Sequence, residues 1–107
     1  MNEKRHQAHN HPIMVVVNIQ SPLVSQADLY AFTTTLVHAT RQEPGCIEYN
    51  CYRSIDDASV TEVIIFDSLE AHKAHMNSPH VLAFMDKHQS LDLQYRVQRV
   101  NYVKNAE

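Results

Sequence analysis

The sequence predicts an α+β fold in which a four-stranded antiparallel sheet carries helices on one face, in the order β-α-β-β-α-α-β. Two observations predict it. Four short segments are rich in β-branched and aromatic residues, which suit a pleated and partly buried surface. Segments with helical periodicity and N-cap residues follow the first and the third of them. A chain of 107 residues is expected to form one domain.

The first half of the predicted domain contains one strand and one helix. Residues 1–12 are polar and lack hydrophobic periodicity, so we interpret them as a disordered leader before a domain at 13–104. The first strand is expected at 13–20, where three consecutive valines indicate a strand covered on both faces. A helix is expected at 25–41, because Ser25 is a suitable N-cap before an apolar stripe.

The second half contains two strands, two helices and a final strand. The strands at 46–54 and 60–66 flank an aspartate-rich turn and are expected to pair antiparallel. One helix is predicted to start after the capping residues 67–68, and the next at Ser78-Pro79, with proline at its first position. The final strand is predicted at 92–104, with a bulge where the alternation of apolar residues changes parity.

Composition excludes several classes of function. The single glycine excludes a glycine-rich phosphate loop and a dinucleotide-binding fingerprint. A net charge of −3 gives no general attraction to nucleic acid, and no apolar run approaches the ~20 residues that span a bilayer. We therefore expect a cytoplasmic protein with neither nucleic acid nor a membrane as its partner. Cys46 and Cys51 are expected on opposite faces of one strand, without a disulfide.

The predicted sheet also favours a homodimer. Helices on one side leave the other face of the sheet uncovered, and we expect that face to be apolar. Two copies placed face to face would bury it and form a closed barrel.

Two blocks of sequence carry a family resemblance. The first joins the third strand to the two following helices, and its matching residues are Phe66, Asp67-Ser68, Glu70-Ala71, Ala74-His75 and Ser78-Pro79-His80. The second leads into the second strand and reads Glu43-Pro44-Gly45-Cys46-Ile47-Glu48-Tyr49. The chain resembles the antibiotic-biosynthesis and quinol monooxygenases, a family of ferredoxin-like domains that form dimeric α+β barrels. The resemblance covers roughly residues 13–104.

The resemblance implies a cavity between the sheet and the helices of each subunit. There a small aromatic or enolisable substrate would be oxidised by molecular oxygen without flavin, haem or metal, and hence without a cofactor. His75 would be the catalytic base, since imidazole exchanges protons near neutrality. Asn18 and Tyr49 would hold the oxygen atoms of the substrate. The remaining substrate-binding residues expected are Phe66, His72, His80 and Phe84.

Each of these residues also has a structural interpretation. Asn18 interrupts the valine run and needs a hydrogen-bond partner if it does not face a ligand. Tyr49 can be a packing residue, His80 can donate to the backbone at a helix start, and His72 can be half-buried. His75 can likewise be structural. We expect no cluster of metal ligands in the folded region.

The chain departs from the family pattern at two positions. Phe66 and Ile64 stand where the family usually has tryptophan and glutamate, and Glu62 is an imperfect substitute for the missing carboxylate. Two alternatives therefore stay open. One is an isomerase of a small phosphorylated dicarbonyl, in which the basic residues Arg41, Arg53 and Lys73 would bind the phosphate. The other is a non-catalytic dimer that binds a small molecule or acts in stress.

Overall fold

The computed structural model describes residues 11–102, and the predicted order of elements is confirmed. A 3-10 turn, η1 (Gln89–Leu91), is the one addition to the predicted order. The elements are β1 (Ile13–Gln20), α2 (Gln26–Arg41), β2 (Cys46–Arg53), β3 (Val60–Phe66), α3 (Leu69–Met76), α4 (Pro79–Lys87), η1 and β4 (Gln94–Asn101).

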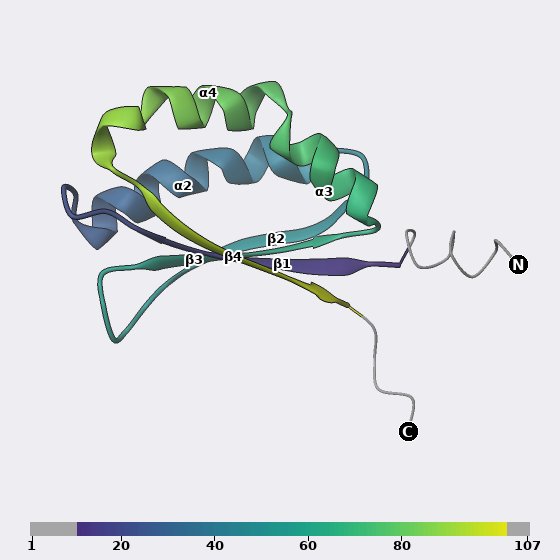
Figure 1. The fold of residues 1–107 in the computed structure, drawn as a ribbon, viewed down its shortest axis with the longest axis horizontal. Helices are drawn as coiled ribbons and strands as arrows, with labels where there is room; N and C mark the ends of the chain where they lie inside the picture. The colour runs from purple at the N-terminus through teal and green to yellow at the C-terminus, as the bar shows by residue number, and fades with distance from the viewer. Residues whose placement is uncertain (1–10, 103–107) are drawn as a thin grey trace, which may run out of the picture.

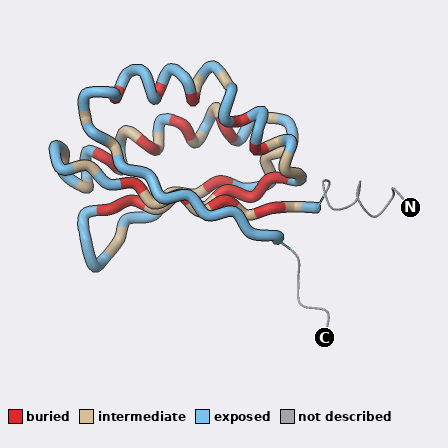
Figure 2. The backbone as a smooth tube through the Cα atoms, in the orientation of Figure 1, coloured by how far each residue is buried: buried red, intermediate tan, exposed pale blue. Residues whose placement is uncertain are grey.

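The molecule has two layers, with all three α-helices on one face of an antiparallel sheet (Figure 1). The strand order is β2-β3-β1-β4, so β1 and β3 are central and β4 is an edge strand. Buried residues lie where the helices face β1, β2 and β3, whereas β4 is exposed along its whole length (Figure 2). The helices therefore cover three strands, and the fourth leaves one side of the interior open.

Alternation along the central strands determines which side chains face the helices. On β1 these are Ile13, Val15, Val17 and Ile19, which are all buried. The residue of β3 paired with Val17 is Glu62, so this carboxyl group also faces the helices.

Capping residues fix where the helices begin. Ser25 Oγ accepts a hydrogen bond from the backbone N–H of Asp28 at 3.1 Å, as the sequence predicts. Ser68 Oγ accepts from the N–H of Ala71 at 3.1 Å and is the N-cap of α3. Pro79 is the first residue of α4, where its missing N–H leaves no intrahelical hydrogen bond unmade.

Gly45 ties the loop before β2 to the start of α3. Its φ of +90° is a conformation that glycine adopts readily and other residues do not. A Cβ at this position would lie 2.7 Å from Ala71 Cβ and 2.7 Å from Asp67 Oδ1. Because this close approach needs glycine, it also places Glu43, two residues before Gly45, beside α3.

Two details of the strands differ from the sequence predictions. β4 pairs with β1 in an uninterrupted register and has no bulge, so Val97 and Val100 simply lie on opposite faces. The register shift occurs instead in β2, between Cys46 and Glu48. That shift places Cys46 and Cys51 on the same face of the strand, and both are free. Residues 1–10 of the predicted leader and residues 103–104 of the predicted strand lie outside the described residues.

The uncovered face of the sheet is apolar only at its centre. Met14, Val16, Val63 and Ile65 form this centre, and polar residues of the same strands, including Asn18 and Thr61, surround it. Among the described residues, no helix is long and apolar enough to cross a membrane.

Candidate functional site

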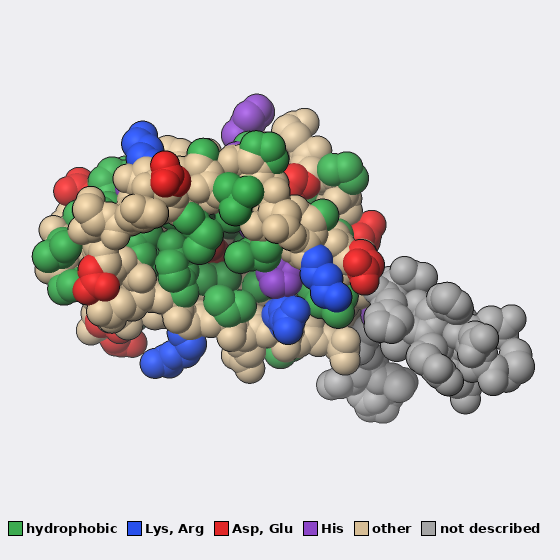
Figure 3. All heavy atoms as spheres, turned by 45° about the horizontal axis from the view of Figure 1, so that its top comes forward, with side chains coloured by type: hydrophobic (Ala, Val, Ile, Leu, Met, Phe, Trp, Pro, Cys, Tyr) green, Lys and Arg blue, Asp and Glu red, His purple; other side chains and the backbone are tan. Residues whose placement is uncertain are grey.

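A cavity of about 430 Å³ lies between the sheet and the helices. Seen from outside, hydrophobic side chains gather in a hollow that has a histidine and basic side chains at one end (Figure 3). The residues that line it are Val15, Val17, Ile19, Leu36, Glu62, Ile64, His72, His75, Met76, Val81, Phe84, Met85, Tyr95, Val97 and Arg99. The lining is thus mainly apolar, with a few polar groups that converge on one space, which is typical of a small-molecule site.

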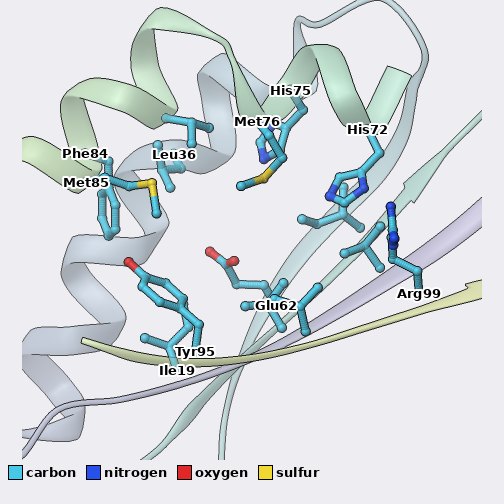
Figure 4. A pocket seen from close by; sticks show the side chains of 15 residues that line it. Ile19, Leu36, Glu62, His72, His75, Met76, Phe84, Met85, Tyr95 and Arg99 are labelled. Atoms are coloured by element: carbon cyan, nitrogen blue, oxygen red, sulfur yellow. The ribbon is translucent and has the colours of Figure 1, made fainter. Parts of the chain in front are cut away.

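Glu62 supplies a carboxyl group at the floor of the cavity. Its side chain rises from β3 toward the space between Tyr95 and His75 (Figure 4). Tyr49 donates its hydroxyl hydrogen to Glu62 Oε2 across 2.5 Å. Burial raises the pKa of Glu62 to about 7, and the hydrogen bond from Tyr49 opposes that rise only in part. Near neutral pH, this carboxyl group therefore exists in both protonation states and can give or take a proton.

His75 lies on the α3 wall, and a carboxylate orients it. Its Nδ1 lies 2.9 Å from Glu43 Oε2 and 3.1 Å from Glu43 Oε1. Because an ionised carboxylate only accepts hydrogen bonds, Nδ1 carries the hydrogen and Nε2 keeps its lone pair. A histidine held in this way has one fixed tautomer and a basic nitrogen available to a ligand. The carboxylate that the sequence suggests is missing at Ile64 is thus supplied by Glu43, from the loop before β2.

Glu43 has a second imidazole partner. His80 Nε2 also hydrogen-bonds Glu43 Oε2, and it lies 3.3 Å from Ser78 Oγ. One carboxylate therefore joins the β2 loop to both α3 and α4.

The expectation that the folded region has no cluster of metal ligands is wrong. One ligand atom each of Glu43, His75 and His80 lie within 4.8 Å of one another, and two imidazoles with a carboxylate are donors that a divalent transition metal accepts. In the structure, the two rings hydrogen-bond the carboxylate, so the cluster is satisfied without an ion.

His72 and Arg99 lie together at one end of the cavity (Figure 4). His72 is 7% exposed, and its Nδ1 is buried without a hydrogen-bond partner among the described residues. Burial lowers the pKa of His72, and the nearby His75 and Arg99 lower it further. This end of the cavity thus combines a neutral imidazole with a fixed positive charge.

The structure brings three of the seven predicted site residues to the cavity: His72, His75 and Phe84. Three others lie directly behind its wall. The ring of Phe66 packs against His72 and His75, with centroids 5.5 and 5.3 Å away. Tyr49 is fully buried and reaches the cavity only through Glu62. His80 lines a smaller hollow beside α4 and reaches the cavity only through Glu43.

Asn18 is placed differently from the expectation that it holds the substrate. It does not line the cavity, because the alternation of β1 turns it toward the uncovered face of the sheet. There its amide donates to Ser59 Oγ at 3.0 Å and, more weakly, to Thr61 Oγ1 at 3.4 Å. The structural interpretation, a polar residue paired within the sheet, is the one observed.

Four residues of the site are not among those expected from the sequence: Glu43, Glu62, Tyr95 and Arg99. In the sequence, Glu43 belongs to a block that matches the family, and Glu62 is an imperfect substitute for a missing carboxylate. An acidic residue within the apolar run of β3 was itself a signal that Glu62 faces something polar. Tyr95 and Arg99 had no comparable signal, since their side depends on the register between β1 and β4.

A sequence model of one family, described as antibiotic biosynthesis monooxygenase, matches residues 12–87 of the chain. Among curated proteins, an uncharacterized protein of Synechocystis, sll1783, is 29% identical over 97 residues. That match covers 90% of this chain and 65% of the Synechocystis protein, so the chain spans just under two thirds of its relative's length.

Solved structures share the fold. Rv0793 from Mycobacterium tuberculosis superposes with a TM-score of 0.77 at 24% identity, over 90% of this chain and 99% of the other. SnoaB, a cofactor-independent oxygenase from Streptomyces nogalater, superposes with a TM-score of 0.75 at 11% identity, over 90% of this chain and 97% of the other. At these identities the superpositions establish the fold alone.

Proposed function

Because the chain belongs to the antibiotic biosynthesis monooxygenase family, we propose that its cavity binds an electron-rich aromatic alcohol and oxidises it with molecular oxygen, without a cofactor. A monooxygenase is the general activity that the family supports. The substrate class and the roles of individual residues are part of the proposal.

The observation that carries the proposal is the Glu43–His75 pair at the wall of an apolar cavity. Deprotonation is the one step that an electron-rich phenol needs before it can reduce oxygen, and His75 Nε2 is a base fixed for it. The apolar lining excludes water and strengthens the electrostatic interactions inside. The size of the cavity, about 430 Å³, suits a molecule of two or three fused rings.

The reaction balances without an added reductant. A naphthol with a free para position gives its phenolic proton to His75 and one electron to O₂, which forms a substrate radical and superoxide. Their combination makes a carbon–oxygen bond at the para carbon and a peroxide anion. The hydrogen on that carbon leaves as a proton while the O–O bond breaks, so one oxygen atom stays as the quinone carbonyl and the other departs as water. The proton on His75 can complete that water.

Glu62 and the edge strand would assist this chemistry. When protonated, Glu62 can donate a hydrogen bond to a substrate oxygen, and its pKa of about 7 permits this at neutral pH. Tyr95 projects from β4 into the same space (Figure 4) and can pack on a ring.

The isomerase alternative has less support from the geometry. None of the three basic residues suggested as phosphate ligands lines the cavity. Arg41 donates to the carbonyl oxygen of Tyr49, Arg53 donates to Gln26, and Lys73 lies 3.9 Å from Glu70 on the outside of α3.

We also propose that the protein works as a homodimer. The apolar centre of the uncovered sheet face and the exposed apolar residues Val100 and Tyr102 of the last strand region support this. Light scattering in dilute neutral buffer should give twice the chain mass of 12.3 kDa. A monomer at micromolar concentration would contradict the barrel.

The activity is tested with 1,5-dihydroxynaphthalene under ¹⁸O₂ in an oxygen electrode. We expect oxygen uptake with equal formation of the hydroxynaphthoquinone, and one ¹⁸O atom in each product molecule. His38→Ala is the control variant, since His38 lies near the end of α2 and outside the cavity. Two-electron oxidation to hydrogen peroxide without ¹⁸O in the product, or no uptake with any phenol of this class, would contradict the proposal.

A further inference from the structure

The His72–Arg99 end of the cavity has no function in the chemistry described above. His75 and Glu62 suffice to move protons, yet a second buried imidazole and a cation line the same space. Packing does not explain the pair, because His72 Nδ1 is buried with no hydrogen-bond partner among the described residues, and Arg99 is an exposed cation that lines an apolar cavity.

Arg99 also has no acidic partner in the described part of the chain. The ion pairs found there join Lys73 to Glu70 and join His75 and His80 to Glu43. Arg99 pairs across the sheet with Val15, whose side chain faces the helices, so its own side chain is held on the cavity side of β4.

We propose that the His72–Arg99 end binds a carboxylate on the substrate, so that the substrate is a hydroxylated aromatic acid. This inference rests on the proposed function, because it names the substrate class of the same cavity. A guanidinium and an imidazole N–H are complementary to the two oxygens of a carboxylate. The carboxylate would accept a hydrogen bond from the imidazole and neutralise the cation at once.

The position of the anion also orients the ring. With the acid group at the His72–Arg99 end, the aromatic body extends past Met76 toward Phe84 and Tyr95 (Figure 4). The central part of that path passes His75 and Glu62. An acid group at one end would thus place a distant phenolic oxygen beside the groups that move its proton.

Binding of non-oxidisable probes tests the inference apart from the oxygenase activity. The probes are 2-naphthoate and its neutral analogue 2-naphthamide, which lack a phenolic hydrogen, titrated calorimetrically at pH 6.5. We expect 2-naphthoate to bind about 10-fold more tightly, within the usual range for a hydrogen bond to a charged group. The chemical shifts of the His72 ring should indicate protonation with 2-naphthoate and not with 2-naphthamide.

Two arginines of the same strand form a matched pair of variants. Arg99→Gln should abolish the preference for the acid, whereas Arg96→Gln should keep it, because Arg96 pairs with Asn18 on the face away from the cavity. His72→Asn should reduce the preference, and unchanged circular dichroism would show that each variant folds.

Several outcomes would overturn the inference. They are equal affinity for the acid and the amide, equal losses in Arg99→Gln and Arg96→Gln, and tighter binding of 2-naphthyl phosphate than of 2-naphthoate. Failure of the proposed function gives a different result. If the protein binds 2-naphthoate through Arg99 but consumes no oxygen, the anion site is supported and the oxygenase activity is contradicted.

Discussion

Two equally buried histidines of α3 have opposite surroundings. His72 and His75 are 7% and 6% exposed, lie one helical turn apart and line the same cavity. Toward the β2 loop, His75 faces the carboxylate of Glu43. Toward β4, His72 faces Arg99, and its Nδ1 has no partner.

This difference shows that burial alone does not define the role of a histidine. A carboxylate partner fixes the tautomer of a ring and leaves its other nitrogen free to accept a hydrogen bond. Burial disfavours the protonated form of His72, the neighbouring His75 and Arg99 add to this effect, and its pKa is lowered accordingly. In our proposals, the ring of His75 therefore acts as the base, and the ring of His72 hydrogen-bonds the acid group of the substrate.

The largest expected effect distinguishes the two rings directly. His75→Ala should lower turnover of a naphthol by ~10²–10⁴-fold, the usual contribution of a positioned acid–base group. His72→Ala should mainly raise KM for a substrate that carries an acid group, since we assign it to binding. Steady-state oxygen uptake measures both constants. A larger loss of kcat in His72→Ala than in His75→Ala would reverse the two roles.

Removing the carboxylate of Glu43 should leave His75, like His72, without a carboxylate partner at Nδ1. Glu43→Gln places an amide, which can donate, against Nδ1, so the hydrogen can move to Nε2 and the basic atom is lost. We expect turnover to fall by about 10–1000-fold. This decrease should not exceed the decrease in His75→Ala. Nitrogen NMR of the His75 ring should show the change of tautomer.

Glu70→Gln is the matched control for that variant. Glu70 lies on the same helix, but its side chain is 69% exposed and pairs only with Lys73. Its replacement should change neither turnover nor the tautomer. If Glu43→Gln and Glu70→Gln behave alike, Glu43 has only a structural role.

The fold was predictable because its signals are local. Valine runs, the caps Ser25 and Ser68, and Pro79 each specify an element within a few residues of themselves. The positions of His72 and His75 on one helix wall also follow from their spacing of three. These features need no knowledge of which strands are neighbours.

The remaining parts of the site depend on contacts between distant segments. Glu43 reaches His75 only because Gly45 allows the loop to approach α3 closely. Arg99 faces the cavity because β4 has no bulge. The change of parity in the sequence wrongly predicts a bulge there. Asn18 is a further example of a position that local sequence does not determine. A shift of one residue in register decides whether a strand side chain faces the helices or the uncovered face of the sheet.

Glu62 is more deeply buried than Glu43, and stability measurements can test the consequence of that burial. Burial raises the pKa of Glu62 from 4.5 to about 7, so the folded state keeps a proton that the unfolded state loses. Stability from this group is therefore complete below pH 4.5 and is lost as pH rises toward 7. Relative to wild type, Glu62→Gln should gain on the order of 3 kcal/mol between pH 4.5 and 8, as an upper limit.

Urea unfolding of both proteins at several pH values in that range measures this gain. The comparison uses the difference between variant and wild type, so that the other carboxylates cancel. A constant difference across the range would mean that Glu62 titrates normally, and that Tyr49 and solvent stabilise its charge better than its burial indicates.

The smallest expected effect concerns Asn18, on the opposite face of the sheet. Asn18→Ala removes the hydrogen bonds to Ser59 and Thr61, so unfolding free energy should fall by about 0.5–1.5 kcal/mol, the usual net value of such an interaction. Turnover should stay within about twofold of wild type, because the side chain does not line the cavity and a substitution away from the site has little effect on it. Thermal melts and oxygen uptake on the same preparation give both values. A tenfold loss of turnover with little loss of stability would mean that a substrate contacts Asn18, and the active cavity would then have to extend to the uncovered face, where a second subunit is expected to pack.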